Sequence, residues 1–188
     1  LYDSHQYPAA AEKYGAAAEA RASLPAYLNW GAALINCSDF SQAEEVTSLG
    51  LQMATRMKRK DFRAACLANL AVARNRLGRI DSAEKTCEEA LELFRMVGDS
   101  HGQADVTLTL GNVHAHRGEY EKAESAYKSA LQRFQAVGND VGQANSRGNM
   151  GNLAMHQEQL PQALAHHRAA LKLHEQVANP LGRANALA

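Results

Sequence analysis

The stretch RGEYEKAESAYKSALQRFQAVGND, from Arg117 to Asp140, decides the fold because the chain repeats it. Forty residues earlier the sequence reads LGRIDSAEKTCEEALELFRMVGDS, and forty residues later it reads QEQLPQALAHHRAALKLHEQVANP. The three versions keep alanine and leucine at matching places, and the first two also keep glycine, whereas the charged residues change. Such self-similarity predicts a helical-repeat fold, in which each repeat must stack on its neighbours to bury its apolar surface.

Each repeat is anchored by apolar and small residues at helical spacing. In the copy quoted first these residues are Tyr120, Ala123, Tyr127 and Ala130-Leu131. Side chains at this spacing form one buried stripe on a helix of 3.6 residues per turn. The anchor recurs once after 33 residues and then every 40, and its other copies begin at Tyr7, Phe40, Ile80 and Leu160.

A second helical pattern precedes the anchors and reads YLNWGAALI, LANLAVARN, TLTLGNVHA and RGNMGNLAM. Its central small residue is Gly31, Ala71, Gly111 or Gly151. We expect this residue to lie where two helices cross closely, because a larger side chain would push them apart. Each repeat therefore consists of an A helix and a B helix, and Gly98 and Gly138 fit B-helix ends in the left-handed conformation. The turns between A and B fall at Gly78, Gly118 and Glu158.

The segment GNVHAHRGEYEKAESAYKSAL resembles the tetratricopeptide repeat (TPR), whose pattern is W-x2-L-G-x2-Y, then A-x3-F, then A-L. The longer repeats, with additional residues around VGDSHGQA and VGNDVGQA, are similar to those of kinesin light chains and of Pins/LGN-type scaffolds. Cys87 and His167 depart from the pattern, since they replace the aromatic residue found at Tyr127. The resemblance implies an all-α fold, a right-handed TPR superhelix (α-solenoid) of antiparallel helix pairs.

The register predicts a single solenoid domain over residues 1–188, with roughly four full repeats and a partial repeat at each end. Neither end carries an obvious polar capping helix, so we expect a fragment of a longer protein, and association between copies through the uncapped ends is an alternative. The expected segments are a B helix over 4–21, repeats over 24–57, 61–97, 101–137 and 141–177, and a partial helix over 180–188.

Composition limits the kinds of partner. The chain carries 20 basic and 20 acidic residues and no formal net charge, which argues against a general binder of nucleic acid or anionic membrane. No stretch approaches the length of apolar sequence that spans a membrane. The cysteines, Cys37, Cys66 and Cys87, are odd in number and widely spaced, which indicates free thiols in a reducing, cytoplasmic setting.

The resemblance further implies that the A helices line the concave face of the superhelix, where their non-core positions form a groove. The residues predicted to bind a partner there are Asn69, Arg76, Asp105, Asn112, His116, Asn145, Asn149, Asn152 and His156. A carboxamide offers both a donor and an acceptor, so a row of asparagines can hold the backbone of an extended peptide, with the charged and imidazole groups and Arg147 tuning specificity. The alternative is that these asparagines are solvated or bond to a neighbouring helix.

Metal and catalytic chemistry find little support in the sequence. His114 and His116 are two residues apart and therefore on opposite sides of a helix. The sequence has no HxxxH, no glycine-rich phosphate loop and no GxSxG. We therefore expect no metal, no cofactor and no catalytic residues, and we interpret the chain as not an enzyme.

The stretch RMKRKDFR, residues 56–63, has five basic residues and one acid. We interpret it first as a solvated loop, with an anionic partner as the alternative. Apart from Phe62 no aromatic residue is interleaved, which argues against nucleic acid. TPR domains that grip a chaperone's terminal carboxylate have groove lysines, whereas this chain has Leu108, Gly148 and Asn145 at such places, so we expect no binding of that ligand.

The sequence thus predicts a protein–protein interaction scaffold that binds a peptide or protein partner in its groove. The alternative is a self-associating structural segment, or a sensor or linker segment of a larger multidomain regulator.

Overall fold

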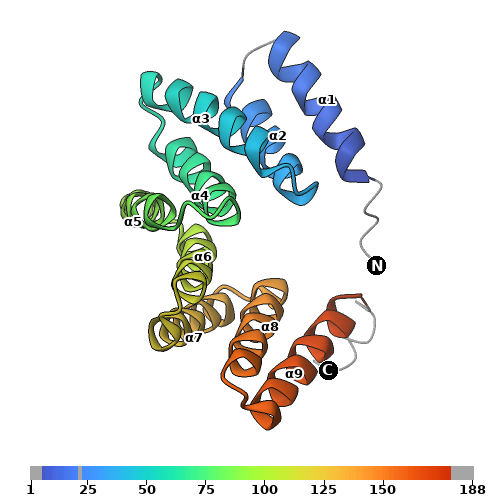
Figure 1. Cartoon of the computed structure of the whole chain (residues 1–188). Coiled ribbons are helices and arrows are strands. Elements are labelled where there is room, and N and C mark those ends of the chain that lie inside the picture. The colour runs from blue at the N-terminus through green and yellow to red at the C-terminus, as the bar shows by residue number, and fades with distance from the viewer. Residues whose placement is uncertain (1–5, 21–22, 179–188) are drawn as a thin grey trace. The chain divides into compact units, whose positions relative to one another are not determined.

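The computed structural model describes residues 6–20 and 23–178, and all regular secondary structure in these residues is α-helical (Figure 1). The prediction of an all-α fold is therefore confirmed. The partial helix predicted over 180–188 lies outside the described residues. Within the described ranges the helices are α1 (Gln6–Ala20), α2 (Leu24–Asn36), α3 (Phe40–Arg56), α4 (Lys60–Arg76), α5 (Ile80–Val97), α6 (Ser100–Arg117), α7 (Tyr120–Ala136), α8 (Asp140–His156) and α9 (Leu160–Ala178).

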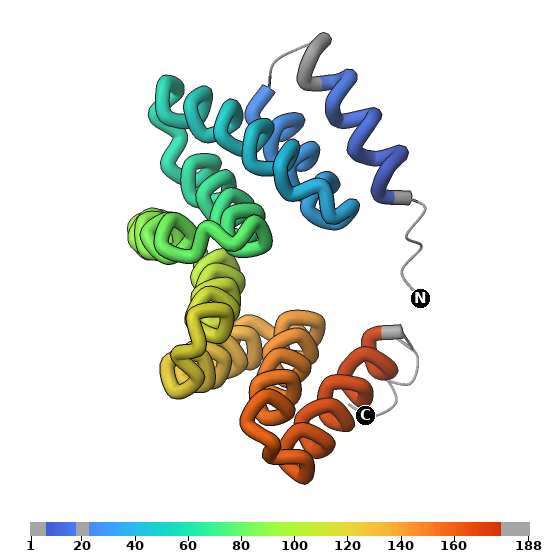
Figure 2. Tube along the Cα trace, in the orientation of Figure 1, coloured from blue at the N-terminus to red at the C-terminus, as the bar shows by residue number. Residues whose placement is uncertain are grey.

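The chain divides into two compact units, Leu1–Gly102 and Gln103–Ala188, with the division inside α6. In the first unit α1 packs on α2, α2 on α3, α3 on α4 and α4 on α5, and α2 also contacts α4. In the second unit α7 packs on α8 and α8 on α9. From α2 to α9, short turns join each helix to the next (Figure 2). The contact between α2 and α4 places the A helices of successive repeats next to each other, as a solenoid of helix pairs requires.

The helix ends explain why the turns are so short. Gly98 and Gly138 have φ of 72° and 66°, which confirms the predicted left-handed ends of α5 and α7. The Asp99 N–H then donates to the carbonyl of Phe94 at 3.0 Å, which closes the end of α5. On the other side of the turn the Asp99 carboxylate accepts from the Gly102 N–H at 2.9 Å and so caps α6.

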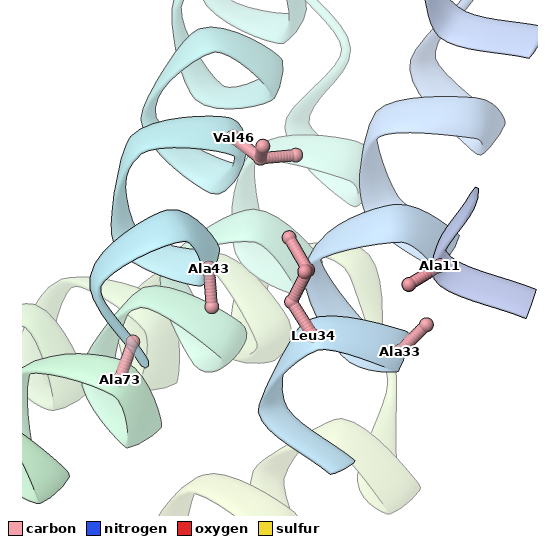
Figure 3. Packing of buried hydrophobic residues seen from close by; sticks show 6 residues of the cluster. All are labelled: Ala11, Ala33, Leu34, Ala43, Val46 and Ala73. Carbon is pink, nitrogen blue, oxygen red and sulfur yellow. The ribbon is translucent and has the colours of Figure 1, made fainter. Parts of the chain in front are cut away.

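Small residues dominate the core of the first unit (Figure 3). One cluster comprises Ala11, Ala33, Leu34, Ala43, Val46 and Ala73, which come from α1, α2, α3 and α4. Tyr27 and Trp30 of α2 pack against this cluster and remain partly exposed. Alanine has no side chain beyond Cβ, so these helices approach closely and bury little side-chain volume per contact.

The predicted close crossings within repeats are confirmed at the central glycines of the A helices. A Cβ at Gly111 would lie 2.5 Å from the ring of Tyr127, and one at Gly151 would lie 2.7 Å from the ring of His167. Gly31 faces Thr47 in the same way. The central glycine of each of these three A helices therefore makes room for a side chain of the following B helix. That side chain occupies the same position of the repeat in all three cases.

A second set of close contacts, which the repeat pattern does not predict, joins successive repeats. A Cβ at Gly102 would lie 2.6 Å from Cζ of Phe94, and one at Gly142 would lie 2.5 Å from Cγ of Phe134. Phe134 is fully buried. In each pair the two residues are eight positions apart, with the additional segment of the long repeat between them. The start of one A helix therefore packs against the phenylalanine near the end of the preceding B helix.

Candidate functional site

In the second unit, most of the predicted binding residues lie on one stripe of α6 and one stripe of α8. Residues three or four apart share a side of a helix, and Asn145, Asn152 and His156 are exposed on α8, with Gly148 partly exposed between them. The matching positions of α6 lie forty residues earlier, and there Asp105 and His116 are exposed. We call this surface the A face; it comprises Asp105, Leu108, Asn112 and His116 of α6 with Asn145, Gly148, Asn149, Asn152 and His156 of α8.

A short hydrogen-bonded chain fixes the centre of the A face. The Tyr127 hydroxyl donates to Oδ1 of Asn112 at 2.9 Å, and Nδ2 of Asn149 donates to the same oxygen at 2.9 Å. Asn112 of α6 is thereby tied to both α7 and α8. These two donors occupy both lone pairs of the Asn112 carbonyl oxygen, and they thereby fix the orientation of its carboxamide. The NH2 group of Asn112, and the Oδ1 and second N–H of Asn149, are the other polar groups of this pair.

Burial suits Tyr127 to its role as the hydrogen-bond donor to Asn112. Its side chain is 3% exposed. Burial disfavours the phenolate and raises the pKa of Tyr127 to about 12. The hydroxyl therefore keeps its proton at neutral pH and continues to orient Asn112.

In the first unit the one predicted asparagine plays a structural part. Nδ2 of Asn69 donates to the backbone carbonyl of Leu28 at 3.3 Å, which ties α4 to α2. Asn69 and Asn149 occupy the same register position, and each bonds to the preceding A helix. The exposed Arg76 guanidinium lies 5.8 Å from the ring centre of Phe40. Asn69, like Asn112 and Asn149 on the A face, thus makes a hydrogen bond to a neighbouring helix.

Arg147 lies outside the stripe of the A face. It is partly buried, and its charge acts on His166 of α9. Burial first, and then the positive charge of Arg147, lower the pKa of His166.

The basic stretch pairs partly within its own unit. Arg59 binds the Asp61 carboxylate at 2.6 Å and lies 4.7 Å from the ring centre of Phe62. Arg63 reaches Glu89 of α5 at 3.1 Å. Because these arginines have partners at an exposed turn, the stretch carries less unneutralised charge than its sequence indicates.

Two hollows are lined by residues other than those of the A face. One of about 320 Å³ in the first unit is lined by residues of α1, α2 and α3, including Trp30 and Leu34. Another of about 440 Å³ lies at the turn between α6 and α7, around Glu119 and Lys122. Across residues 6–20 and 23–178, no three His, Cys, Asp or Glu side chains gather closely enough to bind a metal ion. Among these same residues, no helix combines the length and the apolar character needed to cross a membrane.

Comparison with known proteins agrees with this architecture. Two family models, both described as tetratricopeptide repeat, match residues 63–136 and residues 143–180, which together make up more than half of the chain. A search of curated protein sequences finds no significant match.

Solved structures of low sequence identity share the fold. BtubC (BKLC) from P. vanneervenii is 21% identical with a TM-score of 0.67, and the match covers 92% of this chain and 72% of that one. MamA is 18% identical with a TM-score of 0.60, over 92% of this chain and 91% of MamA. Rap protein, complexed with competence and sporulation factor, is 14% identical with a TM-score of 0.83 over 93% of this chain, which spans 51% of the Rap chain.

Proposed function

The chain belongs to the tetratricopeptide repeat family, and on that premise we propose that it is a protein-interaction scaffold that binds an extended segment of a partner along the A face of its second unit. The observation that carries this proposal is the carboxamide pair of Asn112 and Asn149, which the Tyr127 hydroxyl holds in one orientation. A side chain that is fixed before binding loses little conformational entropy when a ligand arrives.

The chemistry of the pair matches a peptide backbone. The NH2 group of Asn112 can donate to a backbone carbonyl, and Oδ1 of Asn149 can accept from a backbone N–H. Asn145 and Asn152 flank the pair and are exposed, so each can add a donor and an acceptor of its own. These carboxamides are uncharged, which suits recognition of main chain rather than of a charged terminus.

The A face also offers groups that can select among sequences. Asp105, His116 and His156 are exposed on it, and they supply a negative charge and two imidazoles. In the first unit Arg76 stands on the corresponding A-helix position. We assign Asp105, His116 and His156 to specificity and the asparagines of the A face to affinity. The solved Rap structure is a complex with competence and sporulation factor, which supports a partner-binding role for this fold.

We place the chain among binding modules rather than enzymes. Burial raises the pKa of the Cys66 thiol to about 11, and burial together with the charges of Glu84 and Glu88 raises that of Cys87 to about 12. These thiols are therefore poor nucleophiles at neutral pH. Cys37, Cys66 and Cys87 are all free, which supports a cytoplasmic setting.

Self-association remains the second candidate, and the outer surface of α9 favours it. Leu160, Leu164 and Leu171 are 65%, 50% and 58% exposed. Positions four and seven apart share one side of a helix, so the three leucines form an apolar strip. These exposed leucines, with the exposed Arg168 between Leu164 and Leu171, offer a surface that can pair with a second copy. Light scattering separates the candidates, because self-association makes the mass rise with concentration.

The proposed function is tested by selecting peptides from a phage-displayed random library on the wild-type chain and measuring the affinity of one selected peptide by calorimetry. The double variant Asn112→Ala with Asn152→Ala removes two carboxamides of the A face. We expect it to weaken the peptide by at least about tenfold, since a lost hydrogen bond leaves a polar group of the peptide unpaired.

The matched control is Gln132→Ala, which removes an exposed carboxamide from α7, a B helix. It should leave the affinity unchanged. Circular dichroism must show that the double variant keeps its helicity. Undiminished affinity in a double variant with intact helices would reject the proposed site.

A further inference from the structure

The basic stretch between α3 and α4 retains positive charge after its own ion pairs are counted. Arg56, Lys58 and Lys60 are exposed, and no carboxylate among the described side chains forms an ion pair with them. Outside that described set two side chains are acidic, Asp3 and Glu19, and these are fewer than the three cations. The acidic side chains available in this chain therefore cannot neutralise all three.

Two of these cations occupy positions that are locally unfavourable for them. Lys58 adopts a φ of 55°, whereas the equivalent turns forty and eighty residues later have glycine, at Gly98 and Gly138. A residue with a Cβ is strained in this conformation. Lys60 is the first residue of α4, where the positive end of the helix dipole disfavours a cation. The stability of the turn and of the helix thus gives no reason for either lysine.

Exposed methionines lie next to these cations. Met57 is 53% exposed, and Met96, near the end of α5, is 56% exposed. Nζ of Lys60 lies 3.9 Å from Sδ of Met96, so the end of α5 meets the start of α4 at this surface. Methionine is flexible and adapts to apolar partners of different shape. We call this surface of the first unit the basic patch; it comprises Arg56, Met57, Lys58, Lys60 and Met96.

We propose that the basic patch is a second docking site, which binds an acidic segment of another protein that also carries large apolar side chains. The carboxylates of that segment pair with the three cations, and its apolar side chains cover the two methionines. Pairing also relieves the mutual repulsion of cations that lie two residues apart in sequence. This site is separate from the A face, so the inference goes beyond the proposed function.

The chemistry of the patch favours a protein segment over nucleic acid or an anionic membrane. Single-stranded nucleic acid stacks its bases on available aromatic rings. The aromatic residue of this stretch is Phe62, and the Arg59 guanidinium lies over its ring at 4.7 Å from the centre. Recognition of an anionic membrane surface typically uses clusters of about four to eight cations, whereas the patch has three.

The probe for this site is a fluorescent synthetic peptide in which leucines are interspersed among glutamates. Fluorescence anisotropy at low ionic strength measures its affinity for the wild-type chain. We expect it to bind, and we expect the affinity to fall steeply as salt is added, because exposed charges are screened. The same peptide with glutamine in place of every glutamate should not bind.

The decisive variant is Lys58→Gly with Lys60→Ala. It should weaken the glutamate peptide by about tenfold, because two of the three cations are lost. Its midpoint of thermal unfolding should nevertheless rise by about 2–4 °C, since glycine removes the strain at the turn and alanine removes a cation from the start of α4. A variant that is more stable and yet binds less well cannot be explained by damage to the fold.

Two control variants separate charge from strain. Lys85→Ala removes an exposed lysine of α5 that lies outside the basic patch. Glu158→Gly relieves a positive φ at another turn without removing a cation. Both should preserve the affinity for the glutamate peptide. Asn112→Ala with Asn152→Ala should preserve it as well, which distinguishes the basic patch from the A face.

The inference is wrong if the wild-type chain binds the glutamate and glutamine peptides equally, or if the Lys58→Gly, Lys60→Ala variant binds the glutamate peptide as tightly as wild type. It is also wrong if phosphatidylserine vesicles or a single-stranded oligonucleotide bind the wild-type chain and the glutamate peptide does not. Each of these results leaves the proposed function of the A face intact, because that function is measured with peptides selected from the random library.

Discussion

At the scale of single residues, the absence of a side chain at Gly142 maintains the contact between two repeats. A Cβ there would lie 2.5 Å from Cγ of Phe134, a ring that is fully buried and cannot move aside freely. Gly142→Ala should therefore lower the free energy of unfolding by about 1–3 kcal/mol, as overpacking of a core does. Urea unfolding followed by circular dichroism measures this change. Unaltered stability would show that the ring has room to yield.

The buried thiols give a prediction about pH. The pKa values of Cys66 and Cys87 rise from 9.0 to about 11 and about 12, so both stay protonated in the folded chain when the unfolded chain has begun to ionise them. The contribution of these two protonated, buried thiols to the free energy of unfolding is fully present below pH 9. It is lost as the pH rises through 11 to 12.

The same burial should control thiol labelling at pH 8. We expect a thiol reagent to modify Cys37, which is partly exposed, well before Cys66 or Cys87. Mass spectrometry of digested samples identifies the labelled sites. Full labelling should follow only when urea unfolds the chain, and rapid labelling of Cys87 in the native state would contradict its burial.

The side of the helix on which each asparagine of the A face lies could be predicted from the sequence. Its hydrogen-bond partner could not. A period of forty residues combined with 3.6 residues per turn assigns each position to a side of its helix. The partner of a carboxamide depends on which atom of the next helix comes within about 3 Å. Asn69 and Asn149 share a register position, yet one bonds to the Leu28 carbonyl and the other to Asn112. Only the folded structure separates these cases.

At the scale of elements, the turns show how the same connection is made with different residues. Glycine occupies the left-handed position at Gly78 and Gly118, whereas Ser38, Lys58 and Glu158 adopt it with φ of 62°, 55° and 59°. A residue with a Cβ is strained in this conformation by roughly 1–2 kcal/mol. The sequence identified the turn at Glu158 from the register alone, because no glycine marks it.

The turn between α8 and α9 therefore allows a stabilising change. Glu158→Gly should raise the free energy of unfolding by up to about 1 kcal/mol, because glycine adopts a φ of 59° without steric cost. The rise in the urea midpoint measures the gain. Glu158→Ala is the control and should give no gain, since alanine retains the Cβ. A gain of equal size in both variants would mean that the carboxylate, and not the backbone, causes the strain.

The repeat pattern did not predict the packing of Gly102 against Phe94 and of Gly142 against Phe134. The repeat pattern rests on alanine, leucine and the residues spaced with them, and it includes neither Phe94 nor Phe134. A search for an aromatic residue followed eight positions later by glycine would have found both pairs. This spacing reaches across a turn, and helical periodicity within one element cannot detect it.

At the scale of the whole molecule, the repeats account for the pairing of helices, and the family matches agree with it. Each repeat contacts mainly its neighbours, so a periodic sequence specifies local stacking and carries little information on how firmly distant repeats are coupled. The division into two compact units at Gly102 is therefore a property that the sequence did not reveal. A single solenoid domain over 1–188 stays a prediction.

A groove binder and a self-assembling segment differ in their response to ligand and to concentration. We expect the thermal midpoint to rise steadily as a selected peptide is added, since a ligand at 100 times its Kd stabilises a folded protein by about 2.7 kcal/mol. Light scattering should give the same mass over a hundredfold range of protein concentration. A mass that rises with concentration, without any thermal shift from peptide, would favour pairing through the leucine strip of α9.

The central claim is that carboxamides of the A face hold the backbone of a partner, and side-chain amide resonances report on it directly. A titration of the 15N-labelled chain with a selected peptide should shift the NH2 signals of Asn112, Asn145 and Asn152. The NH2 signal of Gln132, which is exposed on the B helix α7, should remain in place. Saturating peptide that leaves the A-face signals unmoved while shifting others would contradict the claim.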